Sequence, residues 1–537
     1  MPANITRIVV AALVACLVTA SLMTLLGLPA GVLPIVLVLA AGATFYAVRD
    51  LDCGPVPDSL APTEWLLLGL ALLIGLLRLV PYAGQYVTGG LAGAVTWDDH
   101  WHFQEVASLV NSARFPPDLN FQPGTPFHFY YLPWMPAAAL SVVAEALTGR
   151  TFIKATYGLD ALALNLAAVW VLLMFLRHAL PAAARGWALG AVLIAGAGPD
   201  GIFAVLNLLT ERTLAHVEWW QTMLGVHNQV SSLTTSLVWV PHHLIGGMAV
   251  LLAVVLATEP GSLAPRGSTK AFAAAGLLIG FAAFSSIFAC LGGLIALSPL
   301  LLDLVRPEHR SKLAMLAGSA LLVGAPQAYI YVNSSAAGGF VVGQAFTEWG
   351  GPSGRVAAGI AGVVVAALLM LAEVGWLYVA AAAIGPRDHT RLGQLALASV
   401  LFLLSTAVIG FSGSNNWAMR GAIVPAILIA CWWAARVTAA RSAVHIKIAT
   451  AALALAALAH LNELALLLGA NAASLGHAAE TADCKQAIRR FNDSGGALDT
   501  AACRDKLSVY HIERRFQKPT LSPEDRELTG RGQIRWF

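Results

Sequence analysis

Long apolar runs follow one another along almost the whole chain, and short polar segments separate them. Most runs are long enough for one helix to cross a hydrocarbon layer of roughly 30 Å, which takes about 17–25 residues. Backbone groups in lipid must find hydrogen bonds within their own segment, so the runs must be helical. The pattern therefore predicts an all-α polytopic transmembrane bundle of about 12–14 spans. The expected spans are 8–27, 31–48, 64–83, 132–148, 157–176, 187–208, 243–258, 271–288, 289–305, 313–332, 356–383, 393–411, 421–437 and 447–469.

The composition agrees with a lipid environment and argues against a soluble core. Hydrophobic residues make up 58% of the 537 residues and charged residues only 11%, against about 25% charged in a typical soluble domain. The net charge of +3 is small and spread over several connections, so nucleic-acid binding is not indicated. The first apolar run continues past Cys16, which favours an uncleaved first helix over a signal peptide.

The distribution of Lys and Arg predicts how the bundle is oriented. Basic residues occupy four connections, which alternate with connections that are nearly free of them, and such basic connections are cytoplasmic by the positive-inside rule. They contain Arg266/Lys270, Arg306/Arg310/Lys312, Arg387/Arg391 and Arg436/Arg441/Lys447. We therefore expect a multi-pass protein of a bacterial inner membrane. The long loops 84–131 and 209–242, the connections 333–355 and 412–420, and the tail 470–537 are then all extracytoplasmic.

Two parts of this topology leave alternatives open. Three apolar runs separate two loops that should lie on the same side, so either 132–148 dips into the outer leaflet and returns, or Gly198–Gly201 breaks the run 187–208 into a hairpin. The polar tail 470–537, which follows the transmembrane domain 1–469, contains Cys484 and Cys503. In an oxidising compartment these either form a disulfide or remain two free thiols.

The first outer loop opens with the most informative segment of the chain, Thr96–Glu105. It contains two adjacent carboxylates, Asp98 and Asp99, followed by His100 and His102. A structural interpretation makes an Asp the N-cap of a short interfacial helix, 101–113. A functional interpretation makes Asp98 or Asp99 a general base, because a carboxylate near a low-dielectric surface has a raised pKa. The pair is also a candidate site for a divalent metal, Mg²⁺ or Mn²⁺; no cofactor is otherwise indicated.

Two further segments of these loops carry candidate substrate-binding residues. The first loop returns to the membrane through a Pro- and Tyr-rich segment that contains His128, Tyr130 and Tyr131. Its aromatic side chains suit an interfacial belt, or stacking on a sugar. The second loop holds Glu218 and ends at His242-His243. We expect this pair to hydrogen-bond a phosphate or a sugar hydroxyl, or else to anchor a helix end at the interface.

A short polar connection between two strong spans contains Asn415, Asn416 and Arg420. Arg420 is basic on the side that the positive-inside rule leaves nearly free of Lys and Arg. A guanidinium binds phosphate through two parallel hydrogen bonds, and the two amides add donors. The segment therefore predicts a phosphate clamp, with an arginine that reaches to lipid headgroups as the alternative.

The acidic pair, the short helix after it and the Pro/Tyr-rich return His128–Trp134 together resemble the GT-C superfamily of membrane glycosyltransferases. That superfamily includes protein O-mannosyltransferases and lipid A aminoarabinose transferases. The resemblance covers about the first 210 residues by pattern and the rest by topology only. It implies a polyprenyl-phosphate sugar donor, an acidic base of the first loop, here Asp98 or Asp99, and a basic residue near the lipid phosphate.

The sequence thus predicts an inverting glycosyltransferase that transfers a sugar to an acceptor hydroxyl on the periplasmic or exterior face. The acceptor is a glycan, a lipid or a protein. A transporter or flippase is the alternative, but it should show ionisable residues deep in several spans and symmetry between its halves. A polymerase or ligase of cell-envelope polysaccharides is a further alternative, and it would use outer-loop Arg and His without the Asp pair.

Overall fold

The computed structural model describes residues 2–52, 59–88, 96, 98–119, 122–126, 130–150, 152–197, 200–211, 229–333, 340–342, 356–384, 390–411, 416–440 and 443–476. The expected all-α class is confirmed, because helices dominate and only short strands accompany them. The expected pair Cys484 and Cys503 lies outside the described residues, as does nearly all of the tail.

The described residues of the first half of the chain form eight α-helices and one hairpin of strands. The helices are α1 (Pro2–Leu26), α2 (Leu33–Val48), α3 (Pro62–Thr88), α4 (Asp99–Val110), α5 (Met135–Thr148), α6 (Ile153–Ala179), α7 (Ala182–Ile194) and α8 (Asp200–Glu211). Strands β1 (Asp118–Leu119) and β2 (Gln122–Pro126) pair antiparallel after α4.

The second half adds the helices that complete the bundle. They are α9 (Leu233–Trp239), α10 (Pro241–Ala257), α11 (Thr269–Ser285), α12 (Ile287–Ala296), α13 (Ser298–Leu304), α14 (Arg310–Asn333), α16 (Val356–Met370), α17 (Trp376–Ala383), α18 (Arg391–Ser405), α19 (Asn416–Gly421), α20 (Ile423–Ala440) and α21 (Ala443–Gly476). Strand β3 (Phe340–Val342) pairs antiparallel with β4 (Ile409–Phe411), which leads into α19.

Within the described residues, eight helices are long and apolar enough to cross a membrane, and the bent pair α12–α13 would be a ninth. The protein is therefore a multi-pass membrane protein. The number is below the expected 12–14 because several expected spans form shorter apolar helices. Leu132–Thr148, Pro241–Ala257, Thr269–Ser285 and Arg391–Ser405 each have 10–17 residues, and α12 and α13 meet at an angle of 70°.

The stretch 132–208, which left the number of crossings odd, forms short helices on both sides of α6, and the two alternatives for it stay predictions. Helix α5 has only 14 residues, or about 21 Å at 1.5 Å per residue. It lies back along the first turns of α6, where Ser141 Oγ is 2.9 Å from Thr156 Oγ1 and the Ala137 amide donates to Asp160 Oδ2. The expected run 187–208 is divided as well, since α7 ends at Ile194 and α8 begins at Asp200.

Three central helices define two opposite ends of the bundle. Near one end, Tyr82 of α3 lies beside Tyr157 in the first turns of α6. At the other, Arg177 near the end of α6 pairs with Glu64 at the start of α3, so the two helices are antiparallel. Helix α10 is parallel to α6, because His178 and Thr258 at their far ends are hydrogen-bonded. We call the end with Tyr82 and Tyr157 the site end.

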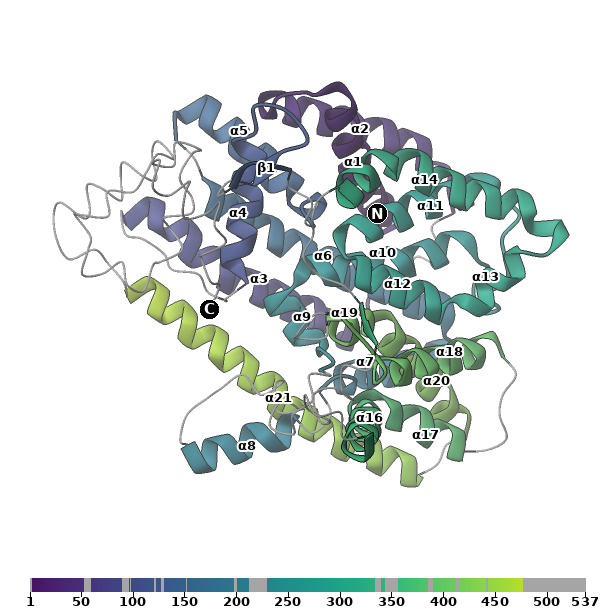
Figure 1. The fold of residues 1–537 in the computed structure, drawn as a ribbon. Coiled ribbons are helices and arrows are strands. Elements are labelled where there is room, and N and C mark those ends of the chain that lie inside the picture. The colour runs from purple at the N-terminus through teal and green to yellow at the C-terminus, as the bar shows by residue number, and fades with distance from the viewer. Residues whose placement is uncertain are drawn as a thin grey trace.

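The other end, which we call the basic end, collects the basic connections expected from the sequence. Arg266 pairs there with Asp52, and Arg306 and Arg391 both pair with Asp303. Figure 1 shows α10 to α14 grouped on one side of the bundle, whereas α21 runs along the opposite side with α8 against it. The arrangement keeps most charges of the described chain out of the apolar middle.

Close helix contact fixes the position of α19 at the site end. A Cβ atom on Gly292 of α12 would lie 2.2 Å from the carbonyl oxygen of Gly421. Any larger residue at position 292 would therefore push α19 away, and small residues are the means by which membrane helices approach this closely. This contact holds the last turn of α19, which carries Arg420, close to the middle of α12.

Candidate functional site

Helix α4 carries the acidic segment into the interior of the bundle. Its Phe103, Val106 and Leu109 are buried, with exposed fractions of 1% or less. The expected helix 101–113 is therefore present and begins two residues earlier, at Asp99. It packs inside the protein and not at the membrane interface. The reason is that Phe103 meets the rings of Tyr82 and Tyr157 from α3 and α6, which offer it a protein environment.

Asp99 is fully buried and every side of its carboxylate is engaged. The Tyr157 hydroxyl donates to Oδ1 at 2.6 Å, and the Tyr82 hydroxyl donates to Oδ2. The backbone amide of Thr96 also donates to Oδ2 at 3.0 Å. This last bond reaches back across the start of the helix as in half of a capping box. Asp99 therefore anchors α4 to α3 and α6.

A buried ion pair completes the surroundings of Asp99. Arg78 Nε of α3 lies 3.2 Å from Asp99 Oδ1, and both side chains have exposed fractions of 1% or less. Burial raises the pKa of Asp99, but the charge of Arg78 and the two tyrosine hydroxyls outweigh it, so the pKa lies below its usual value. An ionised, fully hydrogen-bonded carboxylate is a poor proton acceptor.

Asp98 differs from its neighbour in every one of these respects. It is partly exposed, and no described residue hydrogen-bonds its side chain. It stands at the N-cap position, but its carboxylate caps no backbone amide. The expected N-cap role is therefore wrong for Asp98, because its helical backbone angles turn the side chain away from the first amides. Within the part of the chain that the structure describes, no hydrogen bond holds the Asp98 carboxylate, so it is available to a ligand.

His102 and Glu105 form a buried histidine–carboxylate pair one turn further along α4. His102 Nδ1 lies 3.0 Å from Glu105 Oε2, and both side chains are buried. A carboxylate at Nδ1 holds the proton there and leaves Nε2 with its lone pair. Within the described chain, Nε2 is buried and has no hydrogen-bond partner. His102 is thus an oriented acceptor for a hydroxyl hydrogen.

The first turn of α10 brings the two predicted histidines beside His102. The His102 and His242 ring centres lie 4.5 Å apart, and those of His242 and His243 lie 3.8 Å apart. Tyr130 stands 4.9 Å from His243. Both ring nitrogens of His243 and the Nδ1 of His242 are buried without a partner among the described residues. Buried polar atoms are normally hydrogen-bonded, so this cluster is suited to a polar ligand.

Arg420 of α19 approaches the same histidines. Burial lowers the pKa of its guanidinium, and the nearby Tyr130, Asp98 and Glu105 oppose that change. The positive charge of Arg420 also acts electrostatically on His242 and His243. Nε is buried and has no partner in the described part of the chain. No carboxylate pairs with this arginine among the described residues, and a guanidinium in such surroundings is suited to binding an anion.

The structure therefore brings seven predicted site residues together at the site end. These are Asp98, Asp99, His102, Tyr130, His242, His243 and Arg420. Tyr131 is placed elsewhere, because its hydroxyl donates to Gln327 at 2.5 Å, and Gln327 in turn donates to Thr24. His128, Glu218 and Asn415 lie outside the described residues, as do the side chains of His100 and Asn416.

Sequence reasoning missed Arg78, Tyr82 and Tyr157, which hold Asp99, and gave no role to Glu105. A usable signal was present for Arg78, since it is a charge inside the expected span 64–83 and such charges mark functional or paired sites. The two tyrosines carry no such signal, because an aromatic residue in an apolar run is most simply part of the core.

The predicted divalent metal would have Asp98 as its main carboxylate ligand. Both oxygens of Asp99 already accept hydrogen bonds from the protein. Among the described residues, no group of three or more His, Cys, Asp or Glu side chains could hold a metal ion. The adjacent rings of His242 and His243 in the first turn of α10 have centres 3.8 Å apart and planes tilted by 42°. Mg²⁺ or Mn²⁺ binding at Asp98 stays a prediction that a metal-depletion assay can test.

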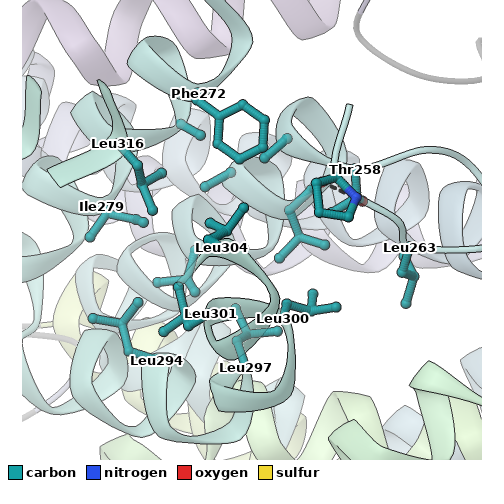
Figure 2. Close-up of a pocket in the computed structure, with 16 residues that line it drawn as sticks. Thr258, Leu263, Phe272, Ile279, Leu294, Leu297, Leu300, Leu301, Leu304 and Leu316 are labelled. Atoms are coloured by element: carbon teal, nitrogen blue, oxygen red, sulfur yellow. Dashed lines mark hydrogen bonds between the residues drawn. The ribbon is translucent and has the colours of Figure 1, made fainter. Parts of the chain in front are cut away.

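An apolar cavity elsewhere in the bundle is separate from this polar cluster. About 490 Å³ of space, part of it open to the outside, lies among the apolar side chains of α10, α11, α12, α13 and α14. Figure 2 shows Phe272, Leu316 and the leucines of α12 and α13 converging on it. The cavity lies toward the basic end and contains none of the predicted site residues.

Comparisons with protein-family models, with curated proteins and with solved structures found no match for this chain. The class that the fold defines is that of a multi-pass helical membrane protein. The function has to be argued from the residues of the site.

Proposed function

We propose that this protein is a membrane glycosyltransferase that uses a polyprenyl-phosphate sugar donor. The observation that carries the proposal is the convergence of unpartnered polar groups at the site end of an otherwise apolar bundle. His102 Nε2, His242 Nδ1, both nitrogens of His243 and Arg420 Nε are all buried without a partner in the described chain. A ligand with an anionic group and a hydroxyl satisfies both the donors and the acceptor among them.

The anionic part of the ligand belongs beside Arg420 and the histidine pair. When the bond between the anomeric carbon and the phosphate oxygen breaks, negative charge develops on the leaving phosphate. A guanidinium and imidazole donors that are already in place stabilise this charge without reorganisation. A donor whose phosphate is attached to a long isoprenoid also suits a site surrounded by membrane helices.

Asp98 is the base in this scheme. It takes the proton of the acceptor hydroxyl while the acceptor oxygen bonds to the anomeric carbon from the side opposite the phosphate. A single displacement of this kind inverts the configuration of the sugar. His102, oriented by Glu105, accepts a hydrogen bond from the acceptor and holds it for attack. Asp99 positions α4 and touches no substrate.

The proposal places the site end on the periplasmic or exterior face of a bacterial inner membrane. Its support is the gathering of Arg177, Arg266, Arg306 and Arg391 at the opposite end, which the positive-inside rule assigns to the cytoplasm. The acceptor is a glycan, lipid or protein hydroxyl that reaches this face.

The test is sugar transfer by membranes that contain the wild-type chain and point variants at matched amounts. A panel of radiolabelled polyprenyl-phosphate sugars serves as donor. We expect Asp98→Asn and Arg420→Ala each to lower transfer at least about a hundredfold. Asp50→Asn is the control, because Asp50 is an exposed carboxylate whose partner is the neighbouring Arg49. A chelator, with Mg²⁺ or Mn²⁺ restored, tests the predicted metal.

Two outcomes contradict the proposal. If the folded wild-type protein consumes no polyprenyl-phosphate sugar, the transporter or flippase alternative becomes the favoured function. Full transfer by Asp98→Asn together with loss in Arg420→Ala would remove the Asp base and favour a polysaccharide polymerase or ligase.

A further inference from the structure

The apolar cavity of Figure 2 lies between helices whose starts are strongly basic. Its walls include Phe272 of α11 and Leu316 of α14, together with leucines of the bent pair α12–α13. Thr258 is the only residue among those that line it with a polar side chain, and its hydroxyl is already bonded to the Val254 carbonyl. The cavity therefore has no hydrogen bonds to offer and suits a hydrocarbon chain.

Helices α11 and α14 run side by side in the same direction from the basic end. Lys312 Nζ lies 5.8 Å from the centre of the Phe272 ring, and Ser319 Oγ of α14 donates to the Ala273 carbonyl of α11. The first turns of the two helices are thus neighbours. They carry Lys270 on α11 and Arg310 and Lys312 on α14.

These three cations have no carboxylate partner within the described chain, in contrast to four arginines of the same end. Arg177, Arg266, Arg306 and Arg391 all pair with Glu64, Asp52 or Asp303. Lys312 Nζ has only His309 Nδ1 at 3.4 Å. The starts of helices favour negative charge, because their backbone amides point outward. Three cations without a carboxylate partner in the described chain therefore stand at two adjacent helix starts beside the apolar cavity, and Glu308 is the one carboxylate of the turn that precedes α14.

We infer that this cavity binds an anionic phospholipid of the leaflet at the basic end. One acyl chain occupies the space between Phe272, Leu301 and Leu316. The phosphate lies by Lys270, Arg310 and Lys312, which are within about a turn of Phe272 on the two helices. Charge complementarity selects the lipid class, since basic pockets between membrane helices bind acidic headgroups and a zwitterionic lipid brings no net charge.

The test uses native mass spectrometry of the full chain, purified in detergent and stripped of lipid. Dioleoylphosphatidylglycerol and dioleoylphosphatidylcholine are added at equal concentrations, with glycerol phosphate as a probe for the head alone. We expect one phosphatidylglycerol to be retained in preference to phosphatidylcholine. Each of Lys270→Gln, Arg310→Gln and Lys312→Gln should weaken that preference by about fivefold. Lys447→Gln, an exposed cation of α21, should leave it unchanged.

A second variant pair tests the cavity itself. Leu301→Trp fills the space, whereas Leu302→Trp alters a neighbouring residue that is 68% exposed and does not line it. We expect Leu301→Trp to lose the bound lipid while Leu302→Trp retains it. Equal retention of the two lipids by the wild-type chain, or equal binding of glycerol phosphate without any chain, would overturn the inference. So would unchanged retention in a folded Leu301→Trp protein.

Discussion

Arg78 Nε lies 3.2 Å from Asp99 Oδ1 in the interior of the bundle, and the hydroxyls of Tyr82 and Tyr157 contact the same carboxylate. This relationship joins three helices at one point. It also separates the roles of two adjacent aspartates, because Asp99 is fully hydrogen-bonded, whereas no described residue bonds the Asp98 carboxylate.

We expect loss of either partner of the buried pair to destabilise the protein by about 3–5 kcal/mol, since the remaining charge would be buried alone. The variants are Asp99→Asn and Arg78→Met, with unfolding followed by denaturant titration in detergent. The double variant should cost less than the sum of the two single changes. Asp50→Asn, which breaks an exposed pair with Arg49, should cost less than about 1 kcal/mol. Additive losses would show that Arg78 and Asp99 do not interact.

The lowered pKa of Asp99 predicts a specific response to acid. A carboxylate whose pKa is lower in the folded than in the unfolded protein stabilises the fold above its usual value of about 3.9. That stabilisation is lost as the pH falls through the lower, folded pKa. Thermal unfolding midpoints measured from pH 7 to pH 2 should therefore fall below about pH 4 in the wild type. The fall of the unfolding midpoint in acid should be smaller in Asp99→Asn than in the wild type. Equal pH profiles of the two proteins would contradict this prediction.

The His102–Glu105 pair should act as one unit in sugar transfer. We expect Glu105→Gln to lower transfer by about tenfold or more, because the amide no longer fixes the proton on Nδ1. His102→Asn should lower it further, and Glu105→Gln should add little in the His102→Asn background. Glu308→Gln, at an exposed position of the basic end, is the matched control. Independent effects of the two changes would show that Glu105 does not act through His102.

Arg420→Lys distinguishes a phosphate clamp from a simple positive charge. Lysine keeps the charge but cannot form two parallel hydrogen bonds to one phosphate. The KM for the donor should rise by about tenfold, while the KM for the acceptor stays within about twofold. Steady-state kinetics with both substrates varied gives the two values. A change confined to the acceptor KM would place Arg420 on the other substrate.

The position of α5 can be tested by labelling. Leu147 near its end is 80% exposed, and we predict it on the same side of the membrane as the site. In a chain whose Cys53, Cys484 and Cys503 are replaced by Ser, Leu147→Cys in intact cells freed of the outer membrane should react with an impermeant maleimide. Glu308→Cys, at the basic end, should react only after the membrane is opened. Because Cys16, Cys290 and Cys431 are buried, they should not react with the maleimide. The reverse pattern would invert the topology.

The sequence by itself determined the class of fold and the segments where chemistry gathers. In a chain with so few charged residues, each cluster of Asp, His or Arg stands out, and His242-His243 and Arg420 were found in this way although they lie far apart in the chain. Among the described residues, eight or nine helices are long and apolar enough to span a membrane, fewer than the expected 12–14, because apolar runs such as 243–258 and 393–411 form helices of 17 and 15 residues. Hydropathy alone does not separate a spanning helix from a shorter buried one.

Only the tertiary structure decided which aspartate is free and what holds the other. Adjacent residues on a helix point about 100° apart, so Asp99 faces α3 and α6 while Asp98 remains partly exposed. The partners of Asp99 are 17, 21 and 58 residues away along the chain. No local pattern encodes such distances, because they depend on how α3, α4 and α6 pack against one another.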